Sequence, residues 1–289
     1  MHYEGTVYRP PSEAHSLIIQ ITIGCSHNTC TFCNMYKDKK FRIRSKDEIF
    51  ADLKEASEFY GPQIRRIFLA DGDALVIKTK DLLDILFYIR EHFPKAERIT
   101  AYGTAQDILF KSKEELCLLQ KAGLQMIYMG IESGDPQILK DVKKDVSREQ
   151  LCEAGRKLAE CGILCSATLI SGLGGRKRLR EHAIASASLI SEIKPAYVGF
   201  LTLMLDPSTP IYSRIQSGTL SLLEPEDVVE EMRLFLNHVD SEGTVFRANH
   251  ASNYILLKGT LNQDIPDMTA YLDQVEKQRR YRDERFRRL

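Results

Sequence analysis

Three cysteines lie close together in the stretch GCSHNTCTFC, residues 24–33. Four residues separate Cys25 from Cys30, and two separate Cys30 from Cys33. Three thiolates from one short loop can hold three corners of a cubic iron–sulfur cluster and leave the fourth iron for another ligand. With His27 as a fourth ligand, the loop could instead hold zinc, whose structural sites take four ligands. The spacing favours the cluster, because a tight loop places four ligands poorly for a tetrahedron.

Six short apolar or β-branched runs alternate with amphipathic stretches, and the cysteines follow the first run. We expect strands to begin at Ser16, Arg65, Arg98, Gln125, Ile163 and Tyr197, and helices near residues 46–59, 79–92, 112–121, 147–160, 177–192 and 224–238. Such alternation predicts an α/β fold with a parallel sheet. Six units fall short of a closed eightfold barrel, so we expect an open partial (β/α)6 barrel with its site at the carboxyl ends of the strands.

Several expected helices carry boundary signals. Ser147 before REQ predicts a capping box, and Gly123 and Gly162 stand where helices should end. A last helix is expected after Asp264. These signals support the alternation of strands and helices.

Composition excludes several classes of protein. The 40 basic and 40 acidic side chains cancel, so the molecule as a whole does not attract nucleic acid or an anionic membrane. No apolar run approaches a membrane span, and the N-terminus MHYEGTVYRPP lacks the apolar region of a secretory signal. We expect a soluble cytoplasmic protein. The basic tail from Lys277 to Leu289 is interpreted as a solvated helix, with phosphate contact as the alternative.

The other four cysteines are interpreted as structural. Cys117 and Cys152 lie in helical patterns, while Cys161 and Cys165 flank a turn and a strand. A reducing compartment keeps thiols open, so we expect buried thiols rather than disulfide bridges.

Polar residues follow the apolar runs at their carboxyl ends. FLADGDAL follows the second run, and the carboxylates of Asp71 and Asp73 would suit an ammonium group. Their alternative role is to cap a helix in a solvated turn. MGIESG follows the fourth run, and Glu132 at the end of an apolar strand is hard to explain by packing. These segments predict a second ligand beside the cysteine loop.

The loop GCSHNTCTFC, with Phe32 before its last cysteine, resembles the cluster loop of radical S-adenosylmethionine (radical SAM) enzymes. The resemblance implies a [4Fe-4S] cluster on Cys25, Cys30 and Cys33, with S-adenosyl-L-methionine chelating the open iron. The commonest family spacing has three residues between the first two cysteines, and this loop has the variant with four. The resemblance extends over about residues 16–240 and implies reductive cleavage of SAM, fed by an electron donor such as flavodoxin or ferredoxin.

The resemblance also assigns cofactor-binding residues at successive strand ends. The segment after the second strand would meet the methionyl amino group, ESG would meet the ribose or methionyl group, and the last two strands would enclose the adenine. The residues assigned in this way are Asp71, Gly72, Asp73, Glu132, Ser133, Gly172, Leu203 and Met204. Tyr102 and Thr104, after the third strand, are expected at the same mouth as cofactor-binding residues, with contact to the substrate as the alternative. Met204 has a core-packing role as its equal alternative.

Beyond a core of residues 1–240, a C-terminal extension of residues 241–289 is expected to close the active site. Many polar side chains of this extension stand among apolar neighbours in the sequence. They should therefore either form hydrogen bonds with each other or bind substrate. The substrate-binding candidates are Arg247, Asn249, His250, Asn253 and Tyr254. The alternative is a polar network that plugs the barrel.

In overall build, with no diagnostic residue, the chain resembles the queuine lyases of queuosine salvage. This implies a small, polar, heterocyclic substrate that yields a 7-deazaguanine precursor. Two alternatives stay open: an RNA-modifying radical SAM enzyme, suggested by the basic tail, and a non-catalytic iron–sulfur or zinc protein. Nucleic acid is not the expected partner, and the sequence does not predict an oligomeric state.

Overall fold

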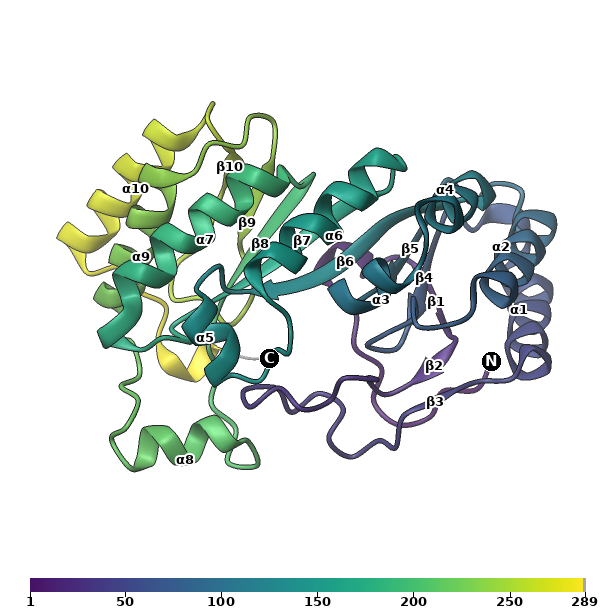
Figure 1. Cartoon of the computed structure of the whole chain (residues 1–289), viewed down its shortest axis with the longest axis horizontal. Coiled ribbons are helices and arrows are strands. Elements are labelled where there is room, and N and C mark those ends of the chain that lie inside the picture. The colour runs from purple at the N-terminus through teal and green to yellow at the C-terminus, as the bar shows by residue number, and fades with distance from the viewer. Residues whose placement is uncertain (288–289) are drawn as a thin grey trace. The chain divides into compact units, whose positions relative to one another are not determined.

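The computed structural model describes residues 1–287 (Figure 1). Its eight main strands form a mostly parallel sheet. The chain divides into two compact units, which we describe separately. The first unit contains residues 1–28, 35–129 and 156–165, and the second contains residues 29–34, 130–155 and the chain from residue 166 onward.

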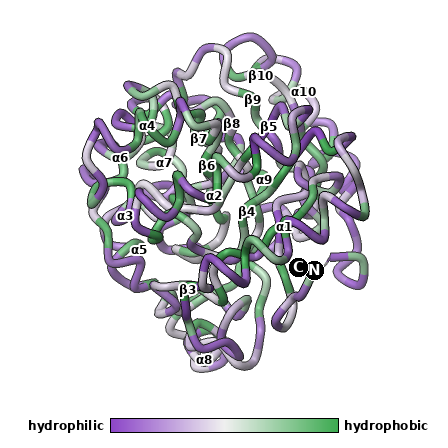
Figure 2. Tube along the Cα trace, turned by 90° about the vertical axis from the view of Figure 1, so that its right-hand side faces the viewer, coloured by the Kyte–Doolittle hydropathy of each residue, from purple (hydrophilic) through white to green (hydrophobic). Residues whose placement is uncertain are grey.

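The first unit is built on a parallel sheet. Its strands are β1 (Leu17–Gln20), β4 (Arg66–Ala70), β5 (Arg98–Tyr102) and the first part of β6 (Leu124–Glu132), with β2 (Thr22–Ile23) and β3 (Arg42–Ile43) as a separate antiparallel pair. β1 pairs with β4, β4 with β5, and β5 with β6. β4 has four consecutive buried residues and is coloured hydrophobic in Figure 2. Strands buried on both faces are typical of a parallel sheet covered by helices.

Helices flank this sheet. They are α1 (Lys46–Tyr60), α2 (Thr79–His92), α3 (Ala105–Phe110) and α4 (Lys113–Ala122), while α6 (Arg148–Glu160) runs from the second unit into the first. α1 and α2 lie side by side (Figure 1). Ser45 and Glu48 form a capping box at the start of α1, and Gly123 ends α4 in the left-handed conformation. These local signals fix where each helix begins and ends.

The second unit continues the alternation. Its elements are α5 (Pro136–Asp141), β7 (Leu164–Ser171), α7 (Leu179–Ile193), β8 (Tyr197–Thr202), α8 (Pro210–Gln216), α9 (Pro225–His238), β9 (Val245–Ala248), β10 (Leu257–Thr260) and α10 (Ile265–Gln278). β7, β8 and β9 are parallel, and β10 is antiparallel to β9. Phe200, Phe235 and Phe246 pack their rings together within its core, with centroids 5.5–5.9 Å apart.

The structure confirms the open α/β partial barrel. The six expected helices are present, and the capping box at Ser147 forms with Gln150. The C-terminal extension adds β9 beside β8 and then β10, and the expected last helix is α10. The short helices α3, α5 and α8 were not predicted. The proposed boundary between residues 240 and 241 stays a prediction.

Two expectations were wrong. Cys117 and Cys161 form a disulfide, with Cα atoms 4.7 Å apart, because α4 and the end of α6 bring them together from positions 44 residues apart. The basic tail is not a helix throughout: α10 ends at Gln278, and only a 3-10 turn follows at Glu284–Phe286. The last two tail residues lie outside the described residues.

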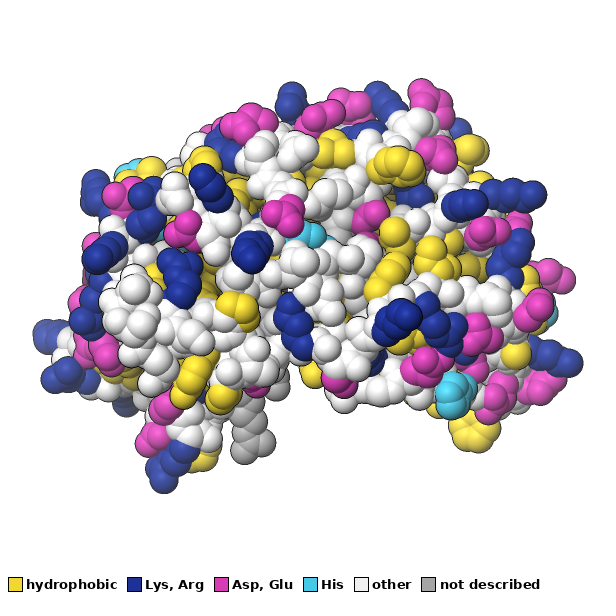
Figure 3. All heavy atoms as spheres, turned by 60° about the horizontal axis from the view of Figure 1, so that its bottom comes forward, with side chains coloured by type: hydrophobic (Ala, Val, Ile, Leu, Met, Phe, Trp, Pro, Cys, Tyr) yellow, Lys and Arg dark blue, Asp and Glu magenta, His cyan; other side chains and the backbone are white. Residues whose placement is uncertain are grey.

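The surface carries charges of both signs. On the face drawn in Figure 3, Lys and Arg side chains lie interspersed with Asp and Glu. This arrangement agrees with the equal numbers of basic and acidic residues in the sequence. Within residues 1–287, no helix has both the length and the apolar character needed to cross a membrane.

Candidate functional site

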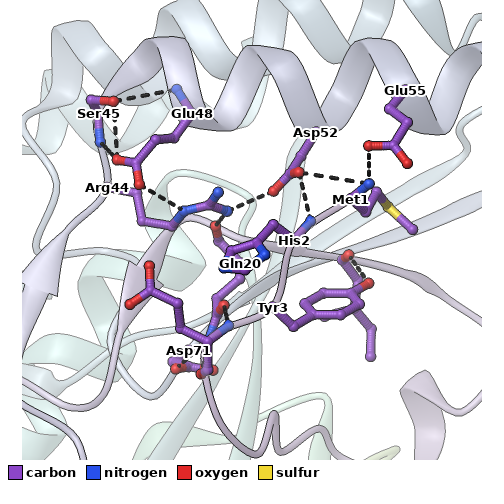
Figure 4. Close-up of polar contacts among 12 residues, drawn as sticks. Met1, His2, Tyr3, Gln20, Arg44, Ser45, Glu48, Asp52, Glu55 and Asp71 are labelled. Atoms are coloured by element: carbon purple, nitrogen blue, oxygen red, sulfur yellow. Dashed lines mark hydrogen bonds and ion pairs between the residues drawn. The ribbon is translucent and has the colours of Figure 1, made fainter.

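Asp71, directly after β4, is fully buried in the first unit and held by three donors. Its Oδ2 accepts hydrogen bonds from Gln20 Nε2 (2.8 Å), the Gly24 amide (3.0 Å) and Lys39 Nζ (2.9 Å); Figure 4 shows Asp71 and Gln20. Its Oδ1 has no hydrogen-bond partner among the described residues. A buried acceptor left open in this way fits an ammonium group, because an unpaired buried carboxylate oxygen is costly.

Gly72 brings the same loop against the cysteine loop. Its amide donates to the Gly24 carbonyl at 3.1 Å. A Cβ added to Gly72 would lie 2.5 Å from Tyr36 Cε2 and 3.1 Å from Cys25 Cβ. The position therefore needs glycine for close approach. Within this unit, the segment after β4 lies directly against the first cysteine.

Asp73 belongs to a buried acid pair. Its carboxylate accepts a hydrogen bond from the Ser26 hydroxyl. Burial, and then the charge of Asp107 and a hydrogen bond with it, raise the pKa of Asp73 well above its usual range. The folded protein therefore favours the protonated form of Asp73.

Tyr102 and Thr104 follow β5 in the same unit. Tyr102 packs edge-on against Phe68 with ring centroids 5.0 Å apart. Thr104 caps α3, and its Oγ1 accepts from the Asp107 amide at 3.2 Å. Thr104 thus has a structural role in the described chain, and its predicted contact with the cofactor stays a prediction.

In the second unit, the segment carrying the last two cysteines is anchored through its backbone. The Thr31 amide donates to the Val142 carbonyl, and the Thr31 carbonyl accepts from the Ile211 amide, both at 3.0 Å. Phe32 packs against the apolar cluster that contains Val142 and Ile211. Asn34 Nδ2 donates to Asp206 Oδ2 at 2.7 Å. Cys30 and Cys33 are therefore carried by a well-packed segment.

Glu132 ends β6 in an unusual backbone conformation. Its φ of 66° lies in the left-handed region. For a residue other than glycine this conformation costs about 1–3 kcal/mol, and such strained residues cluster at functional sites. Its Oε1 accepts from Lys144 Nζ at 2.9 Å. A Cβ on Gly130 would lie 2.1 Å from this Oε1, so glycine leaves room for the carboxylate. The strand end is thus built around Glu132.

Helix α7 supports the residues that follow Glu132. The Gly134 amide donates to Ser186 Oγ at 2.9 Å, and a Cβ on Gly134 would lie 2.2 Å from the Ala185 carbonyl oxygen. Ser133 is fully buried, and its Oγ accepts from the Asp135 amide at 3.0 Å. The ESG segment is therefore a rigid turn against a helix.

The ends of β7 and β8 supply the remaining predicted residues. Gly172 has φ of 88°, which favours glycine, and its amide donates to Glu231 Oε2 at 3.0 Å. Leu203 is buried in the apolar cluster that Phe32 joins, and Met204 is half-buried. In the second unit, then, Glu132, Ser133, Gly172 and Leu203 all lie at carboxyl ends of strands.

The polar residues in and after β9 (Val245–Ala248) are largely engaged with the protein. Asn253 Oδ1 accepts from Thr202 Oγ1 at 2.8 Å, and its Nδ2 donates to the Phe200 carbonyl at 2.7 Å. Tyr254 is buried beneath the Arg287 guanidinium, whose Cζ lies 3.7 Å from the ring centroid. Arg247 and Asn249 are exposed and His250 is half-buried. These last three are the members of the set that solvent reaches most easily.

The cysteines match a cluster by donor type and spacing. Within residues 1–287, no three His, Cys, Asp or Glu side chains form a group arranged to hold a metal. Cys25, Cys30 and Cys33 all lie outside the disulfide. Cys165, in contrast, is fully buried, and burial raises its pKa to about 12. Three thiolate donors from one short loop fit a cluster with an open iron.

A family model described as the radical SAM superfamily matches residues 19–185, more than half of the chain. The chain belongs to the radical SAM superfamily. It is therefore a radical SAM enzyme, of a family that uses S-adenosylmethionine and a [4Fe-4S] cluster. The match includes the cysteine loop and the segments after β4, β5, β6 and β7.

Individual relatives are distant. The heme chaperone HemW of Bacillus subtilis (strain 168) is 23% identical over 230 residues, covering 76% of this chain and 58% of HemW. Further curated relatives are named as a methyltransferase and a putative methylthiotransferase. The chain spans 58% or less of the length of the curated relatives it matches.

Two solved structures share the fold. The methyltransferase TsrM of Kitasatospora setae, with cobalamin and a [4Fe-4S] cluster bound, has a TM-score of 0.57 at 19% identity, covering 70% of this chain and 39% of TsrM. Methylornithine synthase (PylB) has a TM-score of 0.54 at 16% identity, covering 90% of this chain and 81% of PylB. At these identities the likeness shows the fold.

Sequence reasoning missed several residues that shape the site. These are Gln20, Ser26, Lys39, Asp107, His182 and Glu231. A signal was present for two of them, since Gln20 interrupts the apolar run LIIQITI and Glu231 lies on the apolar face of α9. A lone polar residue on a buried face requires a partner.

Proposed function

We propose that Cys25, Cys30 and Cys33 hold the [4Fe-4S] cluster and that the strand-end residues bind S-adenosylmethionine beside it. The observation that carries this proposal is the cysteine loop within the matched family region, with Gly72 packed directly against Cys25. When bound, the cluster supplies an electron that cleaves S-adenosylmethionine to methionine and a 5'-deoxyadenosyl radical. The protein's residues orient the ligands and exclude water.

Specific strand ends would bind specific parts of S-adenosylmethionine. Asp71, with its open Oδ1, would accept a hydrogen bond from the methionyl ammonium. The hydroxyl and carboxylate of Ser133 and Glu132 would bind the ribose or the methionyl group. Gly172 and Leu203 would line the adenine, because a glycine backbone and an apolar side chain both permit close contact with a flat ring.

We propose a small, polar, heterocyclic substrate, as the sequence suggests, and propose that the second unit recognises it. Asp206 is a suitable acceptor: hydrogen bonds from the Ser208 side chain and backbone, followed by one from Asn34, lower its pKa. Asn34 adds an amide beside it. Arg247, Asn249 and His250 are further candidates because solvent reaches them. A carboxylate with a neighbouring amide matches the ring N–H, amine and carbonyl groups of a purine-like ring.

The finer proposal is that this substrate is queuine and the reaction a lyase cleavage in queuosine salvage. Its support is overall resemblance and the Asn34–Asp206 pair, which would suit a deazaguanine ring. Incubating the reduced, loaded enzyme with queuine and S-adenosylmethionine should release a 7-deazaguanine base, detected by mass spectrometry. Steady 5'-deoxyadenosine formation without any loss of queuine would reject this substrate and retain the enzyme class.

The enzyme class is tested by cluster loading. The chain is reconstituted anaerobically with iron and sulfide, reduced with dithionite, and assayed for 5'-deoxyadenosine formed from S-adenosylmethionine. Wild type should bind iron and form the product, and Cys25→Ala, Cys30→Ala and Cys33→Ala should each abolish turnover. Cys165→Ala is the matched control, because its thiol is buried and protonated at neutral pH. Equal iron content and turnover in wild type and the three loop variants would overturn the proposal.

A further inference from the structure

A buried histidine and glutamate join two of the strand ends in the second unit. His182 on α7 and Glu231 on α9 are both essentially unexposed, and α7 packs against α9. His182 Nδ1 lies 2.9 Å from Glu231 Oε1. Neither residue was assigned any role in binding or catalysis by the sequence, and neither belongs to the set proposed to touch S-adenosylmethionine.

The pair reaches the backbone of both strand ends. His182 Nε2 lies 3.4 Å from the carbonyl oxygen of Glu132, at the end of β6. Glu231 Oε2 accepts from Ser171 Oγ at 2.5 Å and from the Gly172 amide at 3.0 Å, at the end of β7. One buried dyad therefore connects the ESG turn to the glycine turn beside it.

The partners of His182 determine its protonation. One ring nitrogen faces a carboxylate and the other faces a carbonyl oxygen, and neither of these groups can donate. Both bonds form only when both ring nitrogens carry hydrogen. Burial of the ring lowers its pKa, but the charge of Glu231 and the hydrogen bonds to Glu231 and Glu132 outweigh burial, so the pKa of His182 is raised.

Other charged groups near the ring are already paired. Asp135, which also favours the charged ring, is bound by Arg178 at 2.7 Å. The Glu132 carboxylate is bound by Lys144. Glu231, on α9, is thus the anion that directly faces the ring of His182, on α7.

We propose that His182 and Glu231 are positioning residues: a doubly protonated His182 holds the Glu132 carbonyl in its left-handed turn, while Glu231 fixes the Ser171–Gly172 backbone, so that both turns are set for S-adenosylmethionine. This rests on the proposed function, because those turns are the proposed binding segments. Neither side chain needs to touch the ligand. Loss of the ring proton releases the Glu132 carbonyl, so affinity for S-adenosylmethionine falls as pH rises through the pKa of His182.

The test compares Glu231→Gln with wild type in the cluster-loaded full chain. The amide keeps the shape of the side chain but removes the charge opposite His182. We expect the dissociation constant of S-adenosylmethionine to rise about tenfold, within the roughly 5- to 150-fold range found when a change at one site alters binding at another. We expect kcat at saturating S-adenosylmethionine to stay near the wild-type value. Glu230→Gln, the exposed neighbour on α9, is the matched control and should bind as wild type does.

A second readout does not depend on activity. Nitrogen NMR of labelled histidine in the full chain reports whether each ring carries one or two protons, and His182→Gln assigns the signal. Wild-type His182 should titrate above the ordinary histidine value of about 6.5, and in Glu231→Gln its titration should move to lower pH. The pH at which S-adenosylmethionine affinity falls should shift to lower pH by the same amount. If Glu231→Gln does not fold, Ser171→Ala is the second variant, because it removes one hydrogen bond that Glu231 accepts. It should weaken S-adenosylmethionine binding to a lesser degree.

The outcomes separate the two proposals. A wild-type chain that loads its cluster but binds no S-adenosylmethionine overturns the proposed function and this inference together. A wild-type chain that binds and cleaves it, with the same affinity and pH profile in Glu231→Gln, overturns the inference alone. A His182 ring that stays neutral across pH 6–8 also overturns the inference alone.

Discussion

Asp71 in the first unit and Asn253 in the second are both fully buried polar side chains, yet their environments differ. Asp71 accepts three hydrogen bonds on its Oδ2, and its Oδ1 has no hydrogen-bond partner among the described residues. Both the side-chain oxygen and the side-chain nitrogen of Asn253 form hydrogen bonds with residues of β8. A buried carboxylate oxygen without a partner is costly unless a ligand compensates it, whereas a fully paired group serves the fold. The first pattern indicates a ligand site, and the second indicates structure.

The largest expected effect is at Asp71. Asp71→Asn removes the anion that compensates the buried Lys39, and breaking such a pair costs about 3–5 kcal/mol of the free energy of unfolding. Urea denaturation of the reduced, cluster-free chain measures this loss. S-adenosylmethionine binding should also weaken in the loaded protein.

A paired change separates the two roles of Asp71. Asp71→Asn combined with Lys39→Met removes both charges, so much of the stability should return while S-adenosylmethionine binding stays weak. Binding that recovers together with stability would mean that Asp71 acts only as the partner of Lys39.

Asn253 should affect stability without affecting the cofactor. Asn253→Ala leaves the Thr202 hydroxyl and the Phe200 carbonyl buried without their partner, which should cost about 2–3 kcal/mol of unfolding free energy. S-adenosylmethionine affinity should be unchanged. A variant of normal stability that loses only turnover of the substrate would instead assign Asn253 to substrate binding.

A smaller effect is expected at Arg287. Its guanidinium stacks on Tyr254 and donates to the carbonyls of Ser252 and Leu203. Arg287→Ala should therefore lower the free energy of unfolding by about 1–2 kcal/mol. The exposed Arg285 is the matched control, and Arg285→Ala should change it by less than about 0.5 kcal/mol. Equal losses in the two variants would show that the tail is not anchored through Arg287.

The smallest expected effect is a pH dependence at Asp73. Because the folded protein raises the pKa of this carboxyl, Asp73 contributes stability at low pH that is lost as pH rises through the raised pKa. Asp73→Asn imitates the protonated form and should remove that loss, so the variant should be the more stable of the two near neutral pH. Unfolding free energies at pH 5 and pH 8 test this. Identical pH slopes for the two proteins would contradict it.

Local patterns account for what the sequence predicted well. The helix over residues 79–92 matches α2, because its apolar spacing is set by neighbours three and four residues apart. The strand ends bearing Asp71 and Glu132 were found because each follows a continuous apolar run. The short helices α5 and α8 were missed, although Pro136 and Pro210 stand at their first positions.

Long-range partnerships account for what was missed. Gln20 and Asp71 are 51 residues apart, and His182 and Glu231 are 49 apart. A single sequence shows that a buried polar residue requires a partner but not which residue supplies it. The same limit applies to Cys117 and Cys161, whose proximity depends on how α4 and α6 are placed.

The bridge between Cys117 and Cys161 bears on how the working protein is handled. A cross-link between positions 44 residues apart is worth about 4 kcal/mol on a chain-entropy model. Thiol reductants, used routinely to prepare oxygen-sensitive clusters, open such bridges through attack by a thiolate. Preparations competent for radical chemistry would then be in the dithiol form, and melting temperatures recorded on aerobically purified material would overstate the robustness of the catalyst.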